Sequence, residues 1–304
     1  MKPQAGLWRL AIVLIVLQLA AASLSVGSAC AQSASAMTIV PALPARQPDG
    51  SIEMPIPFGV DNPGAVGEST RQVSTAKNLI DHGGPILSSS NIYIIYWGNP
   101  SEFPSDLDQG LSTFYEGWGN SSYSNILTQY LRGAPPPTDT LVGSASDTTT
   151  APPSRSPKLK RIVHEACKFT GGTVDPNGIY VVTTSQPLPN ATFCAWHNHG
   201  MCNGSPIVVV FLPKTSGLCQ IVPTNQNNYS NTTQSMVNYA AHELAESMTD
   251  PFINAWYDSH GREVADKCYT KFGPPVTLSN GSVWEVQEYW SNAVGKCLQT
   301  LALP

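Results

Sequence analysis

The residues best suited to chemistry stand together in the segment His242-Glu243-Leu-Ala-Glu246. If this segment is helical, His242 and Glu246 lie one turn apart on the same face, where an imidazole and a carboxylate can hold one metal ion. Glu243 lies beside them and could act as the general base toward water that the metal activates. The spacing matches the H-E-x-x-H motif, with glutamate in place of the second histidine. We therefore predict a catalytic metal site here, with a polar network or an inactive remnant as the alternative.

A metal held by His242 and Glu246 needs a third protein ligand. Glu263 and Asp266 follow Glu246 by 17 and 20 residues, and they lie one turn apart if their short segment is helical. One of the two could bind the metal while the other orients the site; a solvated acidic turn is the alternative. Asp250 is in helical register with Glu246, but the proline after it favours a cap or turn role. Zinc is the expected metal, and another divalent cation stays open because zinc prefers nitrogen and sulfur ligands to carboxylates.

A second group of chemically active side chains is Cys194-Ala-Trp-His197-Asn-His199-Gly-Met-Cys202. The spacing C-x2-H-x-H-x2-C could hold zinc, but the cysteines of an exported protein more often pair with each other. His197 and His199 could then line a cleft, bind substrate or supply a nitrogen ligand, and a packing or surface role is the alternative for each. Two further candidates for substrate contact lie in the turn after the helix: Tyr257 and His260.

The chain around His242 carries the signals of a helix that runs from Asn231 to Asp250. Asn231 can cap the helix start, and Gln234 can complete a capping box. Pro251 disfavours helical geometry at the preceding residue, so the helix should end there. Apolar residues at three- and four-residue spacings form its expected buried stripe: Val237, Ala241, Leu244, Ala245 and Met248.

Strands and helices alternate along the rest of the chain. Three β-branched and aromatic runs predict buried strands at 91–98, 178–184 and 206–212. Helical patterns predict helices within 105–132, broken near residue 119, and over 158–168. Residues 133–157, rich in Pro, Thr and Ser, are expected to form a long loop, and the pair His164-Glu165 is expected on a solvated helix surface. This order predicts an α/β (α+β) fold with one mixed sheet.

The N-terminal residues indicate export. Lys2 and Arg9 precede an apolar run and the small-residue pattern Ala29-Cys30-Ala31, which predicts a signal peptide over residues 1–31 and no membrane anchor after its removal. Residues 32–75 read as a linker or pro-segment, and residues 76–304 as the folded domain. Without residues 1–31 the net charge moves from −5 to −7, because two basic residues and no acidic ones are lost. That balance argues against a nucleic-acid partner, and the protein is expected outside the cell or in the periplasm.

Six cysteines remain after the predicted cleavage, an even number that favours three disulfides in an oxidising compartment. Six cysteines allow fifteen pairings, so the sequence does not determine the scheme. The pairing we expect is Cys194–Cys202 across a short loop, Cys268–Cys297 at the C-terminal segment and, by elimination, Cys167–Cys219.

With these features in view, the chain resembles the phosphate-induced protein/exordium family of secreted proteins over roughly residues 80–300. The resemblance is carried by His82-Gly83-Gly84-Pro85, the runs at 92–97 and 178–184, Phe193-Cys194, His199-Gly200, Met236-Val237, Thr249-Asp250-Pro251-Phe252, Glu263, Cys268 and Cys297. It implies a shared fold and export, and the plant members are cell-wall-associated growth regulators with no established enzyme activity. Those members lack the His-Glu-x-x-Glu set and carry Asn where Asp250 stands, so the resemblance does not imply catalysis.

His242, Glu243 and Glu246 resemble instead the active helix of zinc-dependent peptidases, which implies a single zincin-like domain. The leading prediction is a secreted, monomeric, disulfide-stabilised metal-dependent hydrolase of the zinc metallopeptidase type, acting on a peptide or an extracellular polymer. The alternative is a non-catalytic exordium-like protein that binds cell-wall polymers or a protein partner. A third reading is a glycan hydrolase that uses the carboxylates of Glu243 or Glu246 alone.

Overall fold

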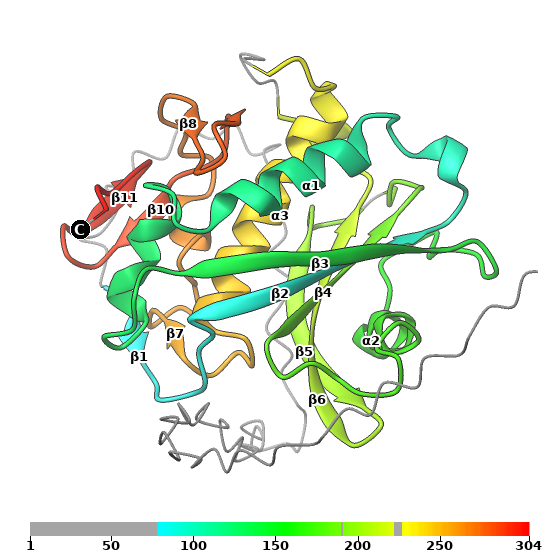
Figure 1. The fold of residues 1–304 in the computed structure, drawn as a ribbon, viewed down its shortest axis with the longest axis horizontal. Helices are drawn as coiled ribbons and strands as arrows, with labels where there is room; N and C mark the ends of the chain where they lie inside the picture. Colours follow the sequence, from blue (N-terminus) through cyan, green and yellow to red (C-terminus); the bar gives the residue numbers. More distant parts are fainter. Residues whose placement is uncertain (1–77, 190, 222–226, 304) are drawn as a thin grey trace, which may run out of the picture. The chain divides into compact units, whose positions relative to one another are not determined.

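The computed structural model describes residues 78–189, 191–221 and 227–303. Its centre is a five-stranded sheet in the order β3-β2-β4-β6-β5 (Figure 1). In that order the strands are Thr138–Asp147, Ser89–Trp97, Gly178–Thr184, Ser205–Pro213 and Trp196–Cys202. The first four run parallel to one another, and β5 pairs antiparallel with β6. The expected mixed α/β fold is confirmed, whereas the predicted signal peptide (1–31) and linker (32–75) lie outside the described residues.

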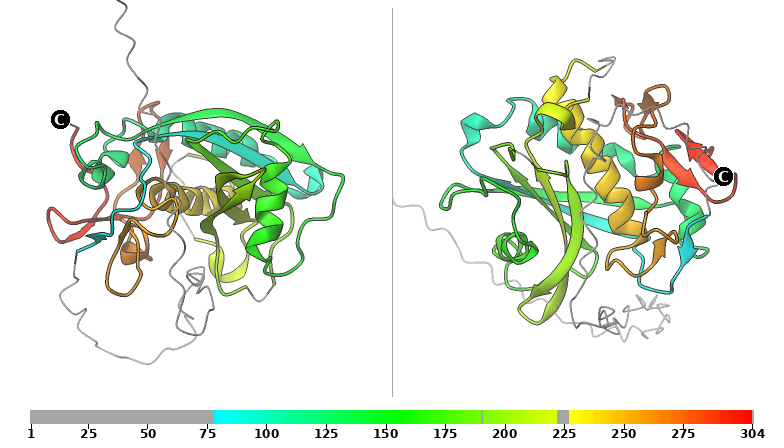
Figure 2. Two further views of the ribbon diagram at one scale, coloured as in Figure 1. Left: turned by 90° about the horizontal axis from the view of Figure 1, so that it is seen from below. Right: turned by 180° about the vertical axis from the view of Figure 1, so that it is seen from behind.

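Helices cover both faces of this sheet (Figures 1 and 2). Helices α1 (Leu107–Trp118) and α3 (Asn231–Thr249) pack on one face, and α2 (Leu159–Cys167) packs on the other. The side chains of β4 therefore alternate between two cores: Ile179 joins the core under α1 and α3, and Tyr180 joins the core under α2. Because both faces are covered, β4 is buried along its whole length. Within the described part of the chain, no helix is long and apolar enough to cross a membrane.

Helix α3 is buried on all sides. Every side chain from Thr233 to Thr249 is buried, so the helix has no solvated face and is not limited to one apolar stripe. Ser230 caps its start, since its hydroxyl accepts a hydrogen bond from the N–H of Thr233; the expected cap at Asn231 was wrong by one residue. The helix ends with Asp250 as its C-cap, as Pro251 predicted.

The C-terminal part of the chain covers the side of α3 that faces away from the sheet (Figure 2). Short strands form three two-stranded sheets there: β1 (Ile80–Asp81) with β7 (Trp256–Tyr257), β8 (Val276–Thr277) with β9 (Val283–Trp284), and β10 (Tyr289–Ser291) with β11 (Lys296–Leu298). The 3-10 helices are η1 (Pro100–Glu102), η2 (Ser124–Tyr130), η3 (Gly217–Cys219) and η4 (Asp266–Cys268). The hydroxyl of Tyr289 donates to the carbonyl of Ala241, 2.6 Å away, and so ties β10 to α3.

Two strands occupy segments where the sequence predicted loops. Strand β3 lies within 133–157 and pairs parallel with β2, although most of its residues are exposed or half-buried. Strand β5 lies within the segment that we expected to be a disulfide-closed loop. Both are edge strands of the five-stranded sheet, and an edge strand that is partly solvated need not carry the apolar run of a central strand.

The disulfides confirm one of the three expected pairings. Cys268–Cys297 is present, but the other four cysteines pair as Cys167–Cys202 and Cys194–Cys219. Cys202 ends β5 and Cys194 lies two residues before the strand begins at Trp196, so the extended strand alone spans roughly 20 Å between them at about 3.3 Å per residue. A disulfide requires Cα atoms within about 7 Å, so the expected short loop is sterically excluded.

The expected solvated surface around His164-Glu165 is also corrected. Both residues belong to α2: His164 is exposed, but Glu165 is buried and accepts a hydrogen bond from the Lys168 ammonium at 2.6 Å. The same ammonium lies 2.9 Å from the carboxylate of Asp147 at the end of β3. The end of β3 is therefore joined to the C-terminal end of α2 by a partly buried ionic network.

Candidate metal centre

Helix α3 places His242 and Glu246 one turn apart, as their spacing predicted. Nε2 of His242 lies 3.2 Å from Oε2 of Glu246. Glu243 follows His242 on the same helix, and all three residues are 3–6% exposed. These ionisable groups are therefore removed from bulk water. Their mutual electrostatic interactions are screened less than those of exposed groups.

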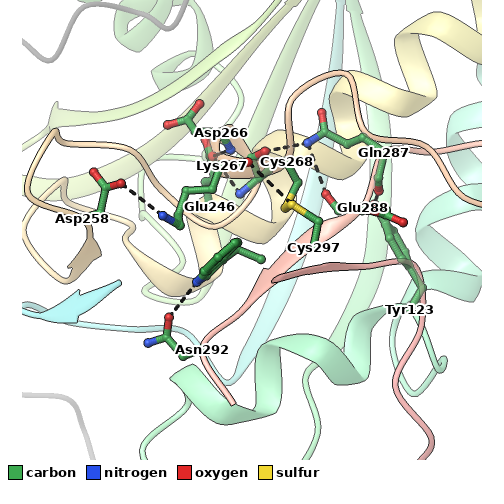
Figure 3. Close-up of a disulfide and its surroundings, with 12 residues drawn as sticks. Tyr123, Glu246, Asp258, Asp266, Lys267, Cys268, Gln287, Glu288, Asn292 and Cys297 are labelled. Atoms are coloured by element: carbon green, nitrogen blue, oxygen red, sulfur yellow. Dashed lines mark hydrogen bonds and ion pairs between the residues drawn. A yellow bond between two sulfur atoms is a disulfide. The ribbon is translucent and has the colours of Figure 1, made fainter. Parts of the chain in front are cut away.

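The segment after β7 supplies another carboxylate, from Asp266 at the start of η4. Its Oδ1 lies 3.5 Å from Nε2 of His242. Oε1 of Glu246 accepts hydrogen bonds from the main-chain N–H groups of Ala265 and Asp266, which leaves Oε2 of Glu246 facing the imidazole. Figure 3 shows Glu246 and Asp266 beside the disulfide at Cys268, which fixes this segment against the C-terminal strands.

Gln287 determines which nitrogen of His242 faces the carboxylates. Its Nε2 donates to the carbonyl of Ala265 at 2.8 Å, so its Oε1 is the atom 2.9 Å from Nδ1 of His242. Nδ1 must then carry the hydrogen, and Nε2 presents its lone pair to Glu246 and Asp266. Two carboxylates facing a nitrogen lone pair repel it unless a proton or a metal ion lies between them.

His197 reaches the same cluster from β5. Its Nδ1 lies 3.5 Å from Oε2 of Glu243 and 3.7 Å from Oε2 of Glu246, and its Nε2 lies 3.7 Å from Oε1 of Glu263. The main-chain oxygen of Asp250, 3.2 Å from Nε2, also contacts the ring. The cluster thus joins β5, α3 and the 263–266 segment, which are far apart in the sequence.

The electrostatics of the cluster reflect its burial. Burial raises the pKa of Glu246 to about 7, with the charge of Asp266 adding to the effect and His242 opposing it. Burial also raises the pKa of Glu263 well above its usual range, and the nearby carboxylates add to that. Burial alone would lower the pKa of His242, but the charge of Glu246 and the hydrogen bond to Asp266 raise it well above its ordinary value. Without a metal, the cluster must therefore retain protons that a solvated set of the same residues would release at neutral pH.

The donor geometry fits a metal ion. Among the described residues, two trios offer ligand atoms within 4.8 Å of one another: His242, Glu246 and Asp266, and His197, Glu246 and Glu263. Two ligands of one tetrahedral zinc ion stand roughly 3.3–3.5 Å apart, which follows from metal–ligand distances of about 2.0–2.1 Å. The separations of 3.2 and 3.5 Å around Nε2 of His242 match this spacing. Imidazole and carboxylate donors suit zinc and other first-row divalent ions.

Asp250 has the turn role that its position predicted. Its Oδ1 accepts hydrogen bonds from the N–H groups of Asn254 and Ala255, which shapes the turn after α3. Burial raises the pKa of this carboxyl group to about 6, while the two backbone donors oppose the shift.

The three other residues proposed to line a cleft have different surroundings: His199, Tyr257 and His260. His199 packs edge-on against Phe252, and the ring of Tyr257 stacks on that of His82 at 3.6 Å. The side chain of His260 is 73% exposed. None of them belongs to either metal-ligand trio found among the described residues. Gln287, which orients His242, was missed because it follows that histidine by 45 residues with no spacing that links the two.

Together these features define a disulfide-bonded α/β protein with a buried candidate metal centre. No family model matches the sequence. The chain is similar to Protein EXORDIUM-like 5 of Arabidopsis thaliana, with 24% identity over 257 residues that cover 67% of this chain and 68% of that protein. This similarity supports the distant relationship to exordium-like proteins that the sequence motifs indicated. With the three disulfides, it suggests an extracellular protein.

Proposed function

We propose that the protein is a secreted metal-dependent hydrolase in which His242, Glu246 and Asp266 hold a zinc ion. The observation that carries the proposal is the position of Nε2 of His242, whose lone pair faces Oε2 of Glu246 and Oδ1 of Asp266. A cation at this point would remove the repulsion among the three donors. The tautomer set by Gln287 is the one that a metal-binding imidazole requires.

The neighbouring side chains would support hydrolysis. Bound zinc supplies a Lewis acid that polarises a carbonyl group and lowers the pKa of water. The carboxylate of Glu243 would accept the proton that water loses on attack and return it to the leaving group. Nδ1 of His197 lies 3.5 Å from Oε2 of Glu243, on the side of the cluster formed by β5.

The substrate proposed for this centre is a peptide. Strand β5, which carries His197 to the cluster, is an edge strand of the described five-stranded sheet. The outer edge of such a strand offers main-chain N–H and C=O groups with which an extended peptide can pair. A peptide bound in this way would run beside the strand that places His197 at Glu243.

The test combines metal content with activity. Purified mature protein should contain zinc by elemental analysis and should hydrolyse an unstructured protein substrate. His242→Ala should lose the zinc, whereas Glu243→Gln should keep it and lose activity by about 10²–10⁴-fold. His164→Ala and Glu116→Gln, which change exposed residues of the same types, are the matched controls.

One rival function has a specific observation in its favour. The similarity to Protein EXORDIUM-like 5, together with the near-complete burial of the cluster, favours a non-catalytic extracellular protein that binds wall polymers or a partner. A zinc-free protein whose Glu243→Gln variant behaves like the parent would support that rival and end the hydrolase proposal.

A further inference from the structure

We infer that the centre holds two metal ions, with the second on His197, Glu246 and Glu263. This inference rests on the proposed function, since it adds an ion to the site on His242, Glu246 and Asp266. The two ligand trios have Glu246 in common and are otherwise composed of different residues. Each supplies one imidazole and two carboxylates.

Glu246 is placed to bridge the two ions. Its Oε1 is occupied by the N–H groups of Ala265 and Asp266. Its Oε2 lies 3.2 Å from the imidazole of His242 and 3.7 Å from that of His197. The same oxygen is thus within ligand–ligand distance of a nitrogen from each trio, as a carboxylate shared by two metals must be.

Glu263 is the independent sign of a second ligand site. The residue is 5% exposed, and its Oε1 has no hydrogen-bond partner among the described residues. The nearest imidazole nitrogen, Nε2 of His197, is 3.7 Å away, which is too long for a hydrogen bond, and it faces the main-chain oxygen of Asp250 at 3.2 Å, so Nδ1 is the nitrogen of His197 left for an ion. Buried carboxylate oxygens are ordinarily satisfied, so this atom is missing a partner that a cation would provide.

The number of carboxylates in the cluster also matches the charge of two divalent ions. Four buried carboxylates surround the two imidazoles: Glu243, Glu246, Glu263 and Asp266. One divalent ion would offset two of the four negative charges that the ionised carboxylates carry, and the other two groups would then have to keep their protons to avoid uncompensated buried charge. A second divalent ion balances all four while both imidazoles stay neutral, the form in which imidazole binds metals.

A second ion would alter the chemistry of the proposed hydrolase. Two ions that share a carboxylate can stabilise both the attacking group and the leaving group of one displacement reaction. A single ion does not stabilise both in this way. Glu263, which the single-ion site does not use, thereby becomes a metal ligand.

The experiment counts zinc ions. Mature protein is stripped with chelator, reloaded with zinc chloride and measured by native mass spectrometry, with circular dichroism as the check on folding. We expect two ions in the parent, and one each in Glu263→Gln and Asp266→Asn, which remove one ligand from each site. Glu116→Gln is the control and should bind two.

Each other result overturns the inference in a recognisable way. A parent that binds one ion, with the same count in Glu263→Gln, removes the second site and leaves the proposed function intact. A parent that binds none removes both. Two ions in the parent and in both ligand variants would mean adventitious surface binding. The number of zinc ions bound by the parent protein already distinguishes one site from two, so the inference can be tested even if a variant fails to fold.

Discussion

Replacing Gln287 with leucine should weaken zinc binding without removing any metal ligand. Gln287 is 1% exposed, and its amide makes two hydrogen bonds at the centre, one with Nδ1 of His242 at 2.9 Å and one to the carbonyl of Ala265 at 2.8 Å. Leucine is similar in volume but makes neither bond. The imidazole then loses the partner that fixes its tautomer, and the segment that carries Asp266 loses a tie to its neighbours.

The magnitude follows from what such outer hydrogen bonds contribute. Loss of the group that orients a metal-binding histidine typically lowers metal affinity about 10- to 100-fold, or about 1.4–2.8 kcal/mol. The second lost bond removes one of two donors to the Ala265 carbonyl, which keeps the N–H of Cys268 at 2.9 Å, so the fold itself loses about 0.5–1.5 kcal/mol. We therefore expect an affinity loss near the upper end of the range and a measurable fall in Tm.

Gln299→Leu is the matched control, and a zinc titration against a chromophoric chelator is the assay. Gln299 is also buried, and its amide also makes two hydrogen bonds, here both with the main chain: it accepts from the N–H of Gly273 and donates to the carbonyl of Val286. The Gln299→Leu substitution should lower Tm but leave zinc affinity unchanged. Equal zinc affinity in Gln287→Leu and the parent, or equal weakening in both variants, would refute the assigned tautomer role.

Three further outcomes are expected. Lys168→Met should lower the free energy of unfolding by about 2–3 kcal/mol at pH 7, less than for a fully buried pair because the lysine is partly exposed. Although burial opposes it, this ammonium holds the pKa of Asp147 well below its ordinary value of 3.8, so the stabilisation is lost only below about pH 4, where denaturation curves of variant and parent should begin to approach each other. Replacing Cys268 and Cys297 with serine should cost about 3–4 kcal/mol by the loop-entropy estimate for their 29-residue separation, measured by denaturant unfolding, and should also weaken zinc binding. In the presence of a chelator, Tm should fall as pH rises from about 5 to 8. Burial raises the pKa of Glu246 from 4.5 to about 7 in the folded protein, so the protonated carboxyl group favours the folded state at low pH, and this stabilisation is lost as the group ionises. Added zinc should reverse the fall in Tm.

The sequence predicted the local part of the candidate site well. A helix fixes which residues share a face, so the neighbouring positions of His242 and Glu246 followed from a spacing of four. Pro251 fixed the helix end for a similarly local reason, since it restricts the residue before it. Residues 178–184 formed a strand with the predicted bounds because a central strand covered on both faces is continuously apolar.

The remainder depended on contacts that no local pattern encodes. β5 was read as a loop because an edge strand carrying His197 and His199 has no apolar run. Both wrong disulfides followed from that error, since a loop would have brought Cys194 and Cys202 together and an extended strand separates them. The residue that orients His242 lies in the irregular C-terminal region, whose position is set by its packing on α3 rather than by its own propensities.

The burial of the cluster links the proposed metal to the fold as well as to the chemistry. Helix α3 is flanked on one side by a regular sheet and on the other by short strands with little regular structure of their own. Ions bound to His197, to α3 and to the 263–266 segment would join these two sides at one point, beside the disulfide at Cys268. Since such a site exists only in the folded chain, metal binding would stabilise the folded state by about 4 kcal/mol when the free metal concentration is a thousand times Kd. The same residues would then serve catalysis and hold the irregular C-terminal region in place, which explains why so many charged groups are kept in a buried position that would otherwise destabilise the protein.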